Sequence, residues 1–156
     1  MADTFTPEKR SEIMSKIRGK DTTPELLVRS IAHQLGYRFR LHYNILPGTP
    51  DLVFPRLKKA IFVNGCFWHT HTCRDGKKAP KSNAAYWGSK RRQNQERDKL
   101  VRKKLRRLEW KVLVIWECQC GNTEKVEVML KTFLGEGQEI ETRRRASLSP
   151  AKTLIQ

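Results

Sequence analysis

The stretch 111-KVLVIW-116 decides the fold class, because it is the most strand-like segment of the chain and lies between two segments with helical character. Before it, residues 84–108 are rich in strong helix formers and carry one apolar stripe on an otherwise basic surface. After it, 123-TEKVEVMLKTFL-134 returns to helical spacing. A strand placed between helices predicts an α/β fold in which the helices pack on the faces of a sheet.

The N-terminal half supplies the other elements of that fold. Helices are predicted at 7–18 and 22–36, where a capping residue precedes apolar positions at helical spacing. Next, 37-YRFRLHY-43 alternates like a half-exposed strand, and the apolar runs 51-DLVF-54 and 60-AIFV-63 are typical of short strands. We expect these three strands to form a meander, so that the whole chain builds a mixed sheet flanked by helices.

The length of 156 residues suits one domain with a hydrophobic core and is short for two. We predict a helical arm at 1–20, one folded domain at 21–135 and a mobile tail at 136–156, which is too polar to pack. The start of the chain does not resemble a secretory signal, and no run reaches the roughly 20 apolar residues of a membrane span. We therefore expect a cytoplasmic protein that does not bind a membrane.

The charge of the chain points to a polyanionic partner. There are 32 Lys and Arg against 16 Asp and Glu, a formal net charge of +16 that attracts nucleic acid and repels other copies of the chain, so we expect a monomer. Between Lys77 and Arg107 stand 13 basic residues against only Glu96 and Asp98. Phosphates would relieve the repulsion within such a helix. Ribosomal and membrane-surface proteins can be equally basic, which keeps a purely electrostatic binder open.

The acid at the head of a strand is the first candidate for chemistry. Asp51 follows the turn 46-LPGTP-50 and opens an apolar run, where an unpaired carboxylate is costly to bury. It either caps the turn or holds a divalent cation at the edge of the sheet. Mg²⁺ needs only one or two carboxylates when other oxygens and water complete its shell.

The segment 64-NGCFWHTHTC-73 holds a second candidate site. Cys66, His71 and Cys73 offer three zinc ligands within eight residues, and the fourth is expected from Cys118 or Cys120 at the end of the strongest strand. Four cysteines in a reducing compartment favour metal binding over disulfides. The competing interpretation is a group of small buried thiols.

Three side chains of this segment remain for other roles. His69 is not needed for zinc and is suited to general acid–base work near neutral pH, although a packed histidine is the ordinary alternative. Phe67 and Trp68 either pack in the core or wedge between base pairs to unstack a duplex. Tyr86 and Trp87, at the head of the basic helix, present the same two alternatives.

Taken together, these motifs resemble the very-short-patch repair (Vsr) endonucleases, bacterial enzymes that nick DNA at T:G mismatches. The matching segments lie in order over residues 8 to 135 and are 46-LPGTPDLVF-54, 60-AIFVNGCFWHTHTC-73, 86-YW-87 and 110-WKVLVIWEC-118. The resemblance implies a restriction-endonuclease-like core, with 21–135 as the endonuclease domain.

The resemblance also implies roles for individual residues. Asp51 and the backbone carbonyl of Val63 would bind Mg²⁺, His69 would activate the attacking water, and Glu25 would organise metal-bound water. The implied zinc ligands are Cys66, His71, Cys73 and Cys118, which selects Cys118 over Cys120. Phe67, Trp68 and Trp87 match the aromatic wedges. The N-terminal helix that contains Met14 resembles the element that binds the opposite groove. Asn64 departs from the pattern, since a His is familiar there.

The resulting hypothesis is a DNA endonuclease of the bacterial cytoplasm, associated with the nucleoid when bound. It would nick one strand of double-stranded DNA on the 5′ side of the thymine in a T:G mismatch and so initiate very-short-patch repair. The alternative of another class is a zinc-stabilised, non-catalytic nucleic-acid-binding protein. Such a binder could lose Asp51 and His69 without losing its activity. A nuclease of the same fold with another substrate is a third possibility.

Overall fold

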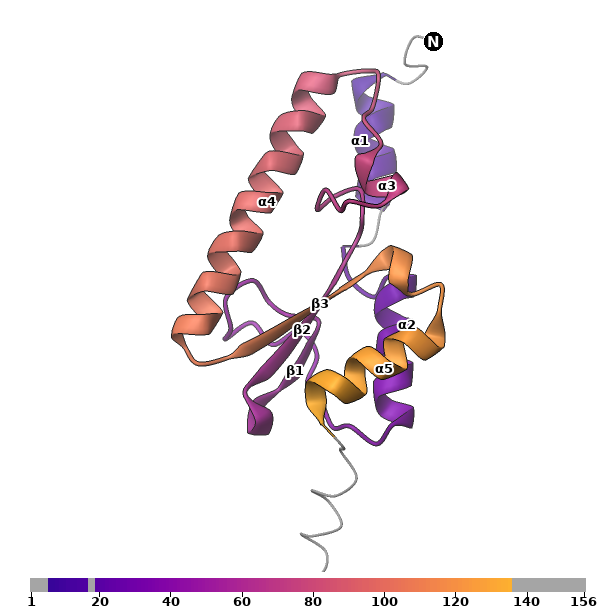
Figure 1. Ribbon diagram of the computed structural model, residues 1–156. Helices are drawn as coiled ribbons and strands as arrows, with labels where there is room; N and C mark the ends of the chain where they lie inside the picture. Colours follow the sequence, from indigo (N-terminus) through magenta and orange to yellow (C-terminus); the bar gives the residue numbers. More distant parts are fainter. Residues whose placement is uncertain (1–5, 17–18, 136–156) are drawn as a thin grey trace, which may run out of the picture.

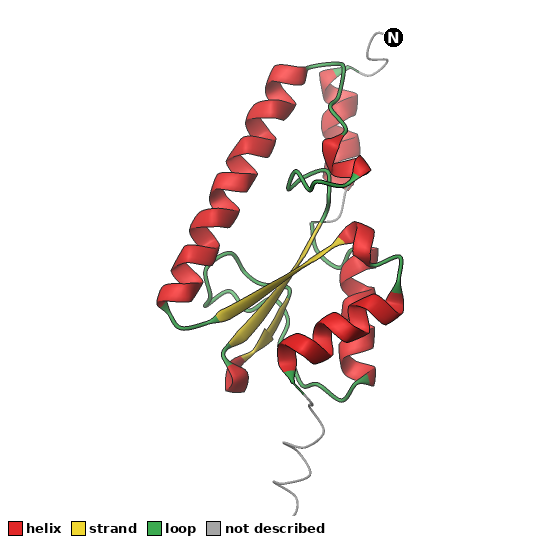
Figure 2. Cartoon of the chain, in the orientation of Figure 1, coloured by secondary structure: helices red, strands yellow, loops and turns green. Residues whose placement is uncertain are grey.

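A three-stranded mixed sheet forms the centre of the structure, a computed structural model that describes residues 6–16 and 19–135. The strands are β1 (Leu52–Phe54), β2 (Lys59–Asn64) and β3 (Lys111–Trp116), in the order β1-β2-β3. β1 is antiparallel to β2, whereas β3 is parallel to β2. Figure 2 shows the sheet in yellow between helices, which confirms the predicted fold class.

Helices account for most of the rest of the described chain. They are α1 (Pro7–Lys16), α2 (Thr23–Gln34), α3 (Arg74–Lys77), α4 (Ala84–Arg107) and α5 (Thr123–Leu134), with short 3₁₀ turns η1 (Pro55–Leu57) and η2 (Glu117–Gln119). α5 has the bounds predicted from its periodicity, and α4 ends one residue earlier than predicted. The single turn α3 was not predicted. No helix in the described ranges is both long and apolar enough to cross a membrane.

One face of the sheet is covered by α2 and α5, which lie against each other (Figure 1). Residues at alternate positions of the strands, such as Leu52, Ile61 and Ile115, point to this side and are fully buried. They pack against Val28 of α2 and Val126 of α5 among others. This is the larger of the two hydrophobic cores.

The opposite face is covered by α4. Here Leu105 is fully buried against Val53 and Leu46, with Val101 and Trp110 at the margin. Only the C-terminal half of α4 contributes to this core, and in Figure 1 the helix continues past the end of the sheet. The N-terminal half of α4 therefore lies outside this core and can contact the loop that follows β2.

The predicted strand at 37–43 is wrong, and with it the three-stranded meander. Its only sheet contact within the described residues is an isolated antiparallel bridge between Arg40 and Val53. His42 has a positive φ of 50°, which ends any extended run, and Tyr37 is buried instead with its hydroxyl donating to the Gly135 carbonyl. The alternate aromatic residues Tyr37 and Phe39 both place their rings against Phe54, so this pattern reflects core packing rather than strand pairing.

Two predicted segments cannot be compared with the structure. The tail at 136–156 and the first five residues of the arm at 1–20 lie outside the described residues. The boundary between the predicted arm and the predicted domain at 21–135 thus stays a prediction.

Candidate active site

Asp51 lies directly before β1 and faces the end of β2. Its N–H donates to the Ile61 carbonyl at 3.0 Å, and its carboxylate accepts from the Val63 N–H at 2.7 Å. Polar groups two residues apart on a strand point the same way, so the Val63 carbonyl also faces the side of Asp51. The carboxylate therefore bonds to β2 and is more than a cap for the preceding turn.

Burial dominates the electrostatics of Asp51. Loss of water raises the pKa of this carboxyl from 3.8 to about 6, although the Val63 N–H favours the ionised form. The nearby carboxylate of Glu25 acts in the same direction as burial, whereas the charges of Arg29 and His42 lower the pKa. Two neighbouring carboxylates and a backbone carbonyl form an oxygen-rich, electronegative site, the donor set that Mg²⁺ prefers.

Glu25 is held rigidly in the first turn of α2. It is 5% exposed, and it accepts from the Asp21 N–H at 2.9 Å and from the Thr22 hydroxyl at 3.0 Å. Arg29, one helical turn later, donates to Glu25 at 3.2 Å and to Asp21 at 2.5 Å. Sequence reasoning missed Arg29, although its i,i+4 spacing from Glu25 is a recognisable signal.

His69 is paired with Asp98 of α4. Its Nδ1 lies 2.5 Å from the Asp98 carboxylate, and both side chains are about one-fifth exposed. A carboxylate on Nδ1 keeps the proton there and leaves Nε2 to accept one. Sequence reasoning missed this partner, because Asp98 stood out only as one of two acids in a basic segment.

Four zinc-type ligands meet at the ends of β2 and β3. The side-chain donor atoms of Cys66, His71, Cys73 and Cys118 all lie within 4.8 Å of one another. The Cys118 N–H also donates to the Cys66 sulfur at 3.3 Å. The Cys120 thiol instead donates to the Trp116 carbonyl at 3.6 Å, which places it outside the cluster. Three thiolates and one imidazole fit a structural zinc site.

The loop that carries these ligands turns tightly. The Cys73 sulfur accepts from the Gly76 N–H at 3.4 Å at the start of α3. A Cβ on Gly76 would overlap the His71 carbonyl, so a side chain is excluded there. The Gly76 N–H and then His71 lower the pKa of Cys73 to about 6, whereas burial raises that of Cys66 to about 12. Cys73 is thus the cysteine whose lowered pKa favours the thiolate form that zinc binds.

An aromatic cluster stands between this loop and α4. Ring centroids lie 5.2 Å apart for Phe67 and Trp68, 5.7 Å for Trp68 and Trp87, and 6.0 Å for Phe67 and Trp87. The Arg91 guanidinium covers Phe67 at 4.9 Å. All three rings are half-buried and belong to neither hydrophobic core, which argues against simple core packing. Tyr86, 53% exposed, touches the edge of this cluster through Trp87.

Comparison with known proteins assigns the chain to a family. The family profile described as DNA mismatch endonuclease Vsr matches residues 2–75. The chain is 37% identical over 126 residues to the DNA mismatch endonuclease Vsr of Escherichia coli, covering 81% of this chain and 80% of that protein. This chain belongs to the Vsr family of DNA mismatch endonucleases.

Other relatives carry names of nicking enzymes. The type II nicking enzyme V.XorIIP of Xanthomonas oryzae is 45% identical over 134 residues, covering 86% of this chain and 98% of that protein. V.NmeAIP of Neisseria meningitidis is 42% identical over 122 residues, covering 78% and 86%. Membership of the Vsr family confirms the expectation of a DNA endonuclease.

The remaining predicted positions of the Vsr pattern differ in what the structure says of them. Asn64 is 8% exposed at the end of β2, directly before residues 65–73, the ligand loop that carries Cys66, His71 and Cys73. Val63 contributes backbone groups, so its side chain is free to join the core beside α2 and α5. Met14 belongs to α1, but the position of its side chain lies outside what the structure describes.

Proposed function

We propose that this Vsr-family chain nicks one strand of double-stranded DNA on the 5′ side of the thymine in a T:G mismatch. The observation that carries the proposal is the half-buried carboxylate of Asp51, fixed at 2.7 Å on the Val63 N–H beside a second carboxylate, Glu25. A protein that only coats nucleic acid has no need to keep two acids together in a strongly basic chain.

Asp51 and the Val63 carbonyl are the groups that would hold Mg²⁺, and Glu25, whose charge acts on Asp51, would order the surrounding water. When bound, Mg²⁺ neutralises charge on a phosphate and makes water more acidic. Arg29 fixes the Glu25 carboxylate and offsets part of its charge.

His69 is the proposed general base. Asp98 holds Nδ1, so Nε2 takes the proton of the attacking water as its oxygen bonds to phosphorus. The bond from phosphorus to the leaving sugar oxygen breaks, and that oxygen acquires a proton from solvent. Asp98 then stabilises the imidazolium that results.

The aromatic cluster of Phe67, Trp68 and Trp87 supplies selectivity in this proposal. An inserted ring unstacks bases, which costs less at a mismatch because part of the pairing and stacking is already lost. The zinc site would hold the loop that carries Phe67 and Trp68 rigid. Basic residues along α4 would bind the phosphates and position the duplex.

The decisive experiment is strand cleavage of a labelled duplex with one T:G mismatch, beside its matched T:A twin. We expect a Mg²⁺-dependent nick next to the thymine by the wild type and none by Asp51→Ala, which should still bind. Equal nicking of both duplexes would show that cleavage does not require a mismatch and would contradict that part of the proposal. Tight binding of both without any cut would favour the non-catalytic binder.

A further inference from the structure

A cavity of about 210 Å³ lies between the ligand loop and α4, and both His69 and the zinc-type ligand His71 line it. The loop residues from His69 to Thr72 form one wall, and Trp116 closes the end. The α4 wall is formed by Gln95, Asp98, Lys99 and Arg102. The candidate general base therefore opens into a space whose other wall is mostly polar or basic.

Arg102 is the half-buried cationic side chain of this wall. It lies one helical turn after Asp98, the usual spacing for an ion pair, yet the Asp98 carboxylate is committed to His69. Within residues 6–16 and 19–135, Arg102 makes no hydrogen bond or ion pair, although it is half-buried. A guanidinium partly withdrawn from water gains most from an anionic partner that it can bind with two N–H groups.

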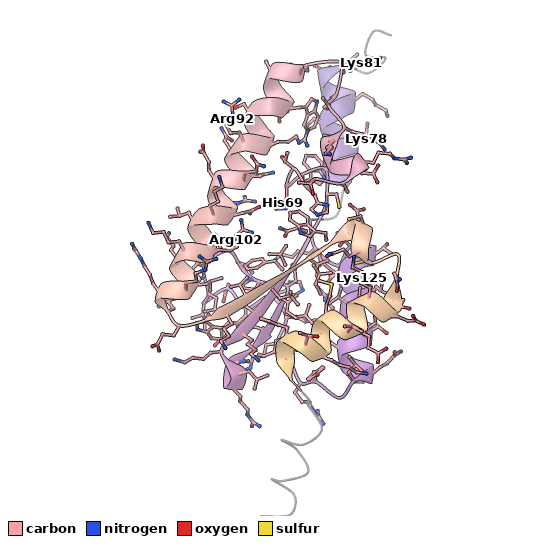
Figure 3. The ribbon with its side chains drawn as sticks, viewed as in Figure 1. His69, Lys78, Lys81, Arg92, Arg102 and Lys125 are labelled. Carbon is pink, nitrogen blue, oxygen red and sulfur yellow. The ribbon has the colours of Figure 1, made fainter. Side chains whose placement is uncertain are left out.

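The surroundings favour an anion over a base. Trp116, the tryptophan of the cavity, is already stacked on His71 with centroids 4.3 Å apart, so one of its two faces is not free for a nucleobase. Lys99 adds a second positive charge on the same wall. Figure 3 shows Arg102 on the side of α4 that faces His69. Arg102 also borders a second cavity of about 380 Å³, whose lining includes Arg106 and Lys111 and no carboxylate.

We propose that the cavity beside His69 is a phosphate subsite, in which Arg102, assisted by Lys99, binds a non-scissile phosphate of the strand being cut. This inference rests on the proposed function, since it takes His69 as the group beside the reacting phosphate. Holding a neighbouring phosphate fixes the strand along its axis and so sets which phosphodiester bond meets His69.

The test combines protein variants with duplexes in which single phosphates near the nick are replaced by neutral methylphosphonates. On an all-phosphate T:G duplex, Arg102→Ala should lower kcat/KM about ten- to hundred-fold, the usual effect of losing one charge-assisted contact. Arg102→Lys should recover part of this loss. Lys125→Ala, an exposed residue of α5 that lines neither cavity, should change little.

The methylphosphonate series identifies the contact. One position should slow the wild type by a similar factor and leave Arg102→Ala unaffected, because the variant has no contact left to lose. If Arg102→Ala and the wild type lose the same factor at every position, the phosphate subsite is excluded. Unfolding midpoints of the variants separate this outcome from damage to the fold.

The same series in an Asp51→Ala background separates the inference from the proposed function. There the readout is the Kd of the uncut duplex, which does not require catalysis. A position-specific loss of affinity that depends on Arg102 would support the subsite even if the expected nick is never seen. Affinity losses that are identical with and without Arg102 would overturn it, whatever the cleavage result.

Discussion

At the scale of the residue, the half-buried carboxylate of Asp51 makes the stability of the fold depend on pH. Its folded pKa of about 6 lies above the ordinary 3.8, so the folded chain binds this proton more tightly than the unfolded chain. The contribution of Asp51 to stability is therefore most favourable below about pH 4 and is lost as the pH rises to about 6. The full cost amounts to about 3 kcal/mol.

Comparison of the wild type with Asp51→Asn isolates this effect. Without added Mg²⁺, urea unfolding should show the variant gaining stability relative to the wild type between pH 4 and pH 7, because the amide carries no charge. Added Mg²⁺ should stabilise the wild type more at pH 7 than at pH 5. A difference between the two proteins that stays constant with pH would show that Asp51 titrates normally.

Arg29 makes a second prediction at this scale. Its side chain and that of Glu25 are only 11% and 6% exposed, so Arg29→Met leaves a carboxylate buried without its cation. We expect a loss of about 3 kcal/mol in the free energy of unfolding. The double variant Arg29→Met with Glu25→Gln should recover most of it, since no buried charge remains. Equal losses in the single and double variants would rule out the charge as the cause.

At the scale of the element, Cys118 joins the ligand loop to the turn η2 that follows β3. Metal analysis of the wild type should find close to one zinc ion per chain. Cys118→Ser should lower this content and destabilise the loop. Cys120→Ser is the matched control two residues away, because its thiol bonds to the Trp116 carbonyl outside the cluster. Full zinc content in the Cys118 variant would exclude the four-ligand site.

Elements and site residues were predictable where a local pattern determines them. The strand at 111–116 and the helix at 123–134 follow from periodicity, and both have the predicted bounds. The prediction of a strand at 37–43 failed because Tyr37 is fixed by a contact with a residue 98 positions away. Likewise, whether Glu96 or Asp98 reaches His69 depends on how α4 is rotated against the loop, which no local spacing reports.

At the scale of the whole molecule, the aromatic cluster and the candidate active site are linked by α4. Trp87 and Asp98 belong to this one helix, and Asn94 between them donates to the Trp68 carbonyl at 3.1 Å. Trp68→Ala should therefore lower the preference for T:G over T:A duplex about tenfold in kcat/KM, since stacking of one base is worth about 1–3 kcal/mol. Tyr86→Ala, at the margin of the cluster, is the control. Unchanged selectivity in Trp68→Ala would contradict the proposal that Trp68 acts as a wedge.

The charge of +16 is unevenly placed over the molecule, and this makes duplex binding depend on salt in a way that maps the interface. Figure 3 shows Lys81 and Arg92 toward the end of α4 that carries Trp87, whereas Lys125 lies on α5. Each phosphate contact steepens the plot of log K against log salt by about 0.9. Replacing Lys81 and Arg92 together by Ala should thus make the slope shallower by up to about 2, and Lys125→Ala should leave it unchanged. Equal changes in both variants would mean that the whole charge, and not the α4 side, attracts DNA.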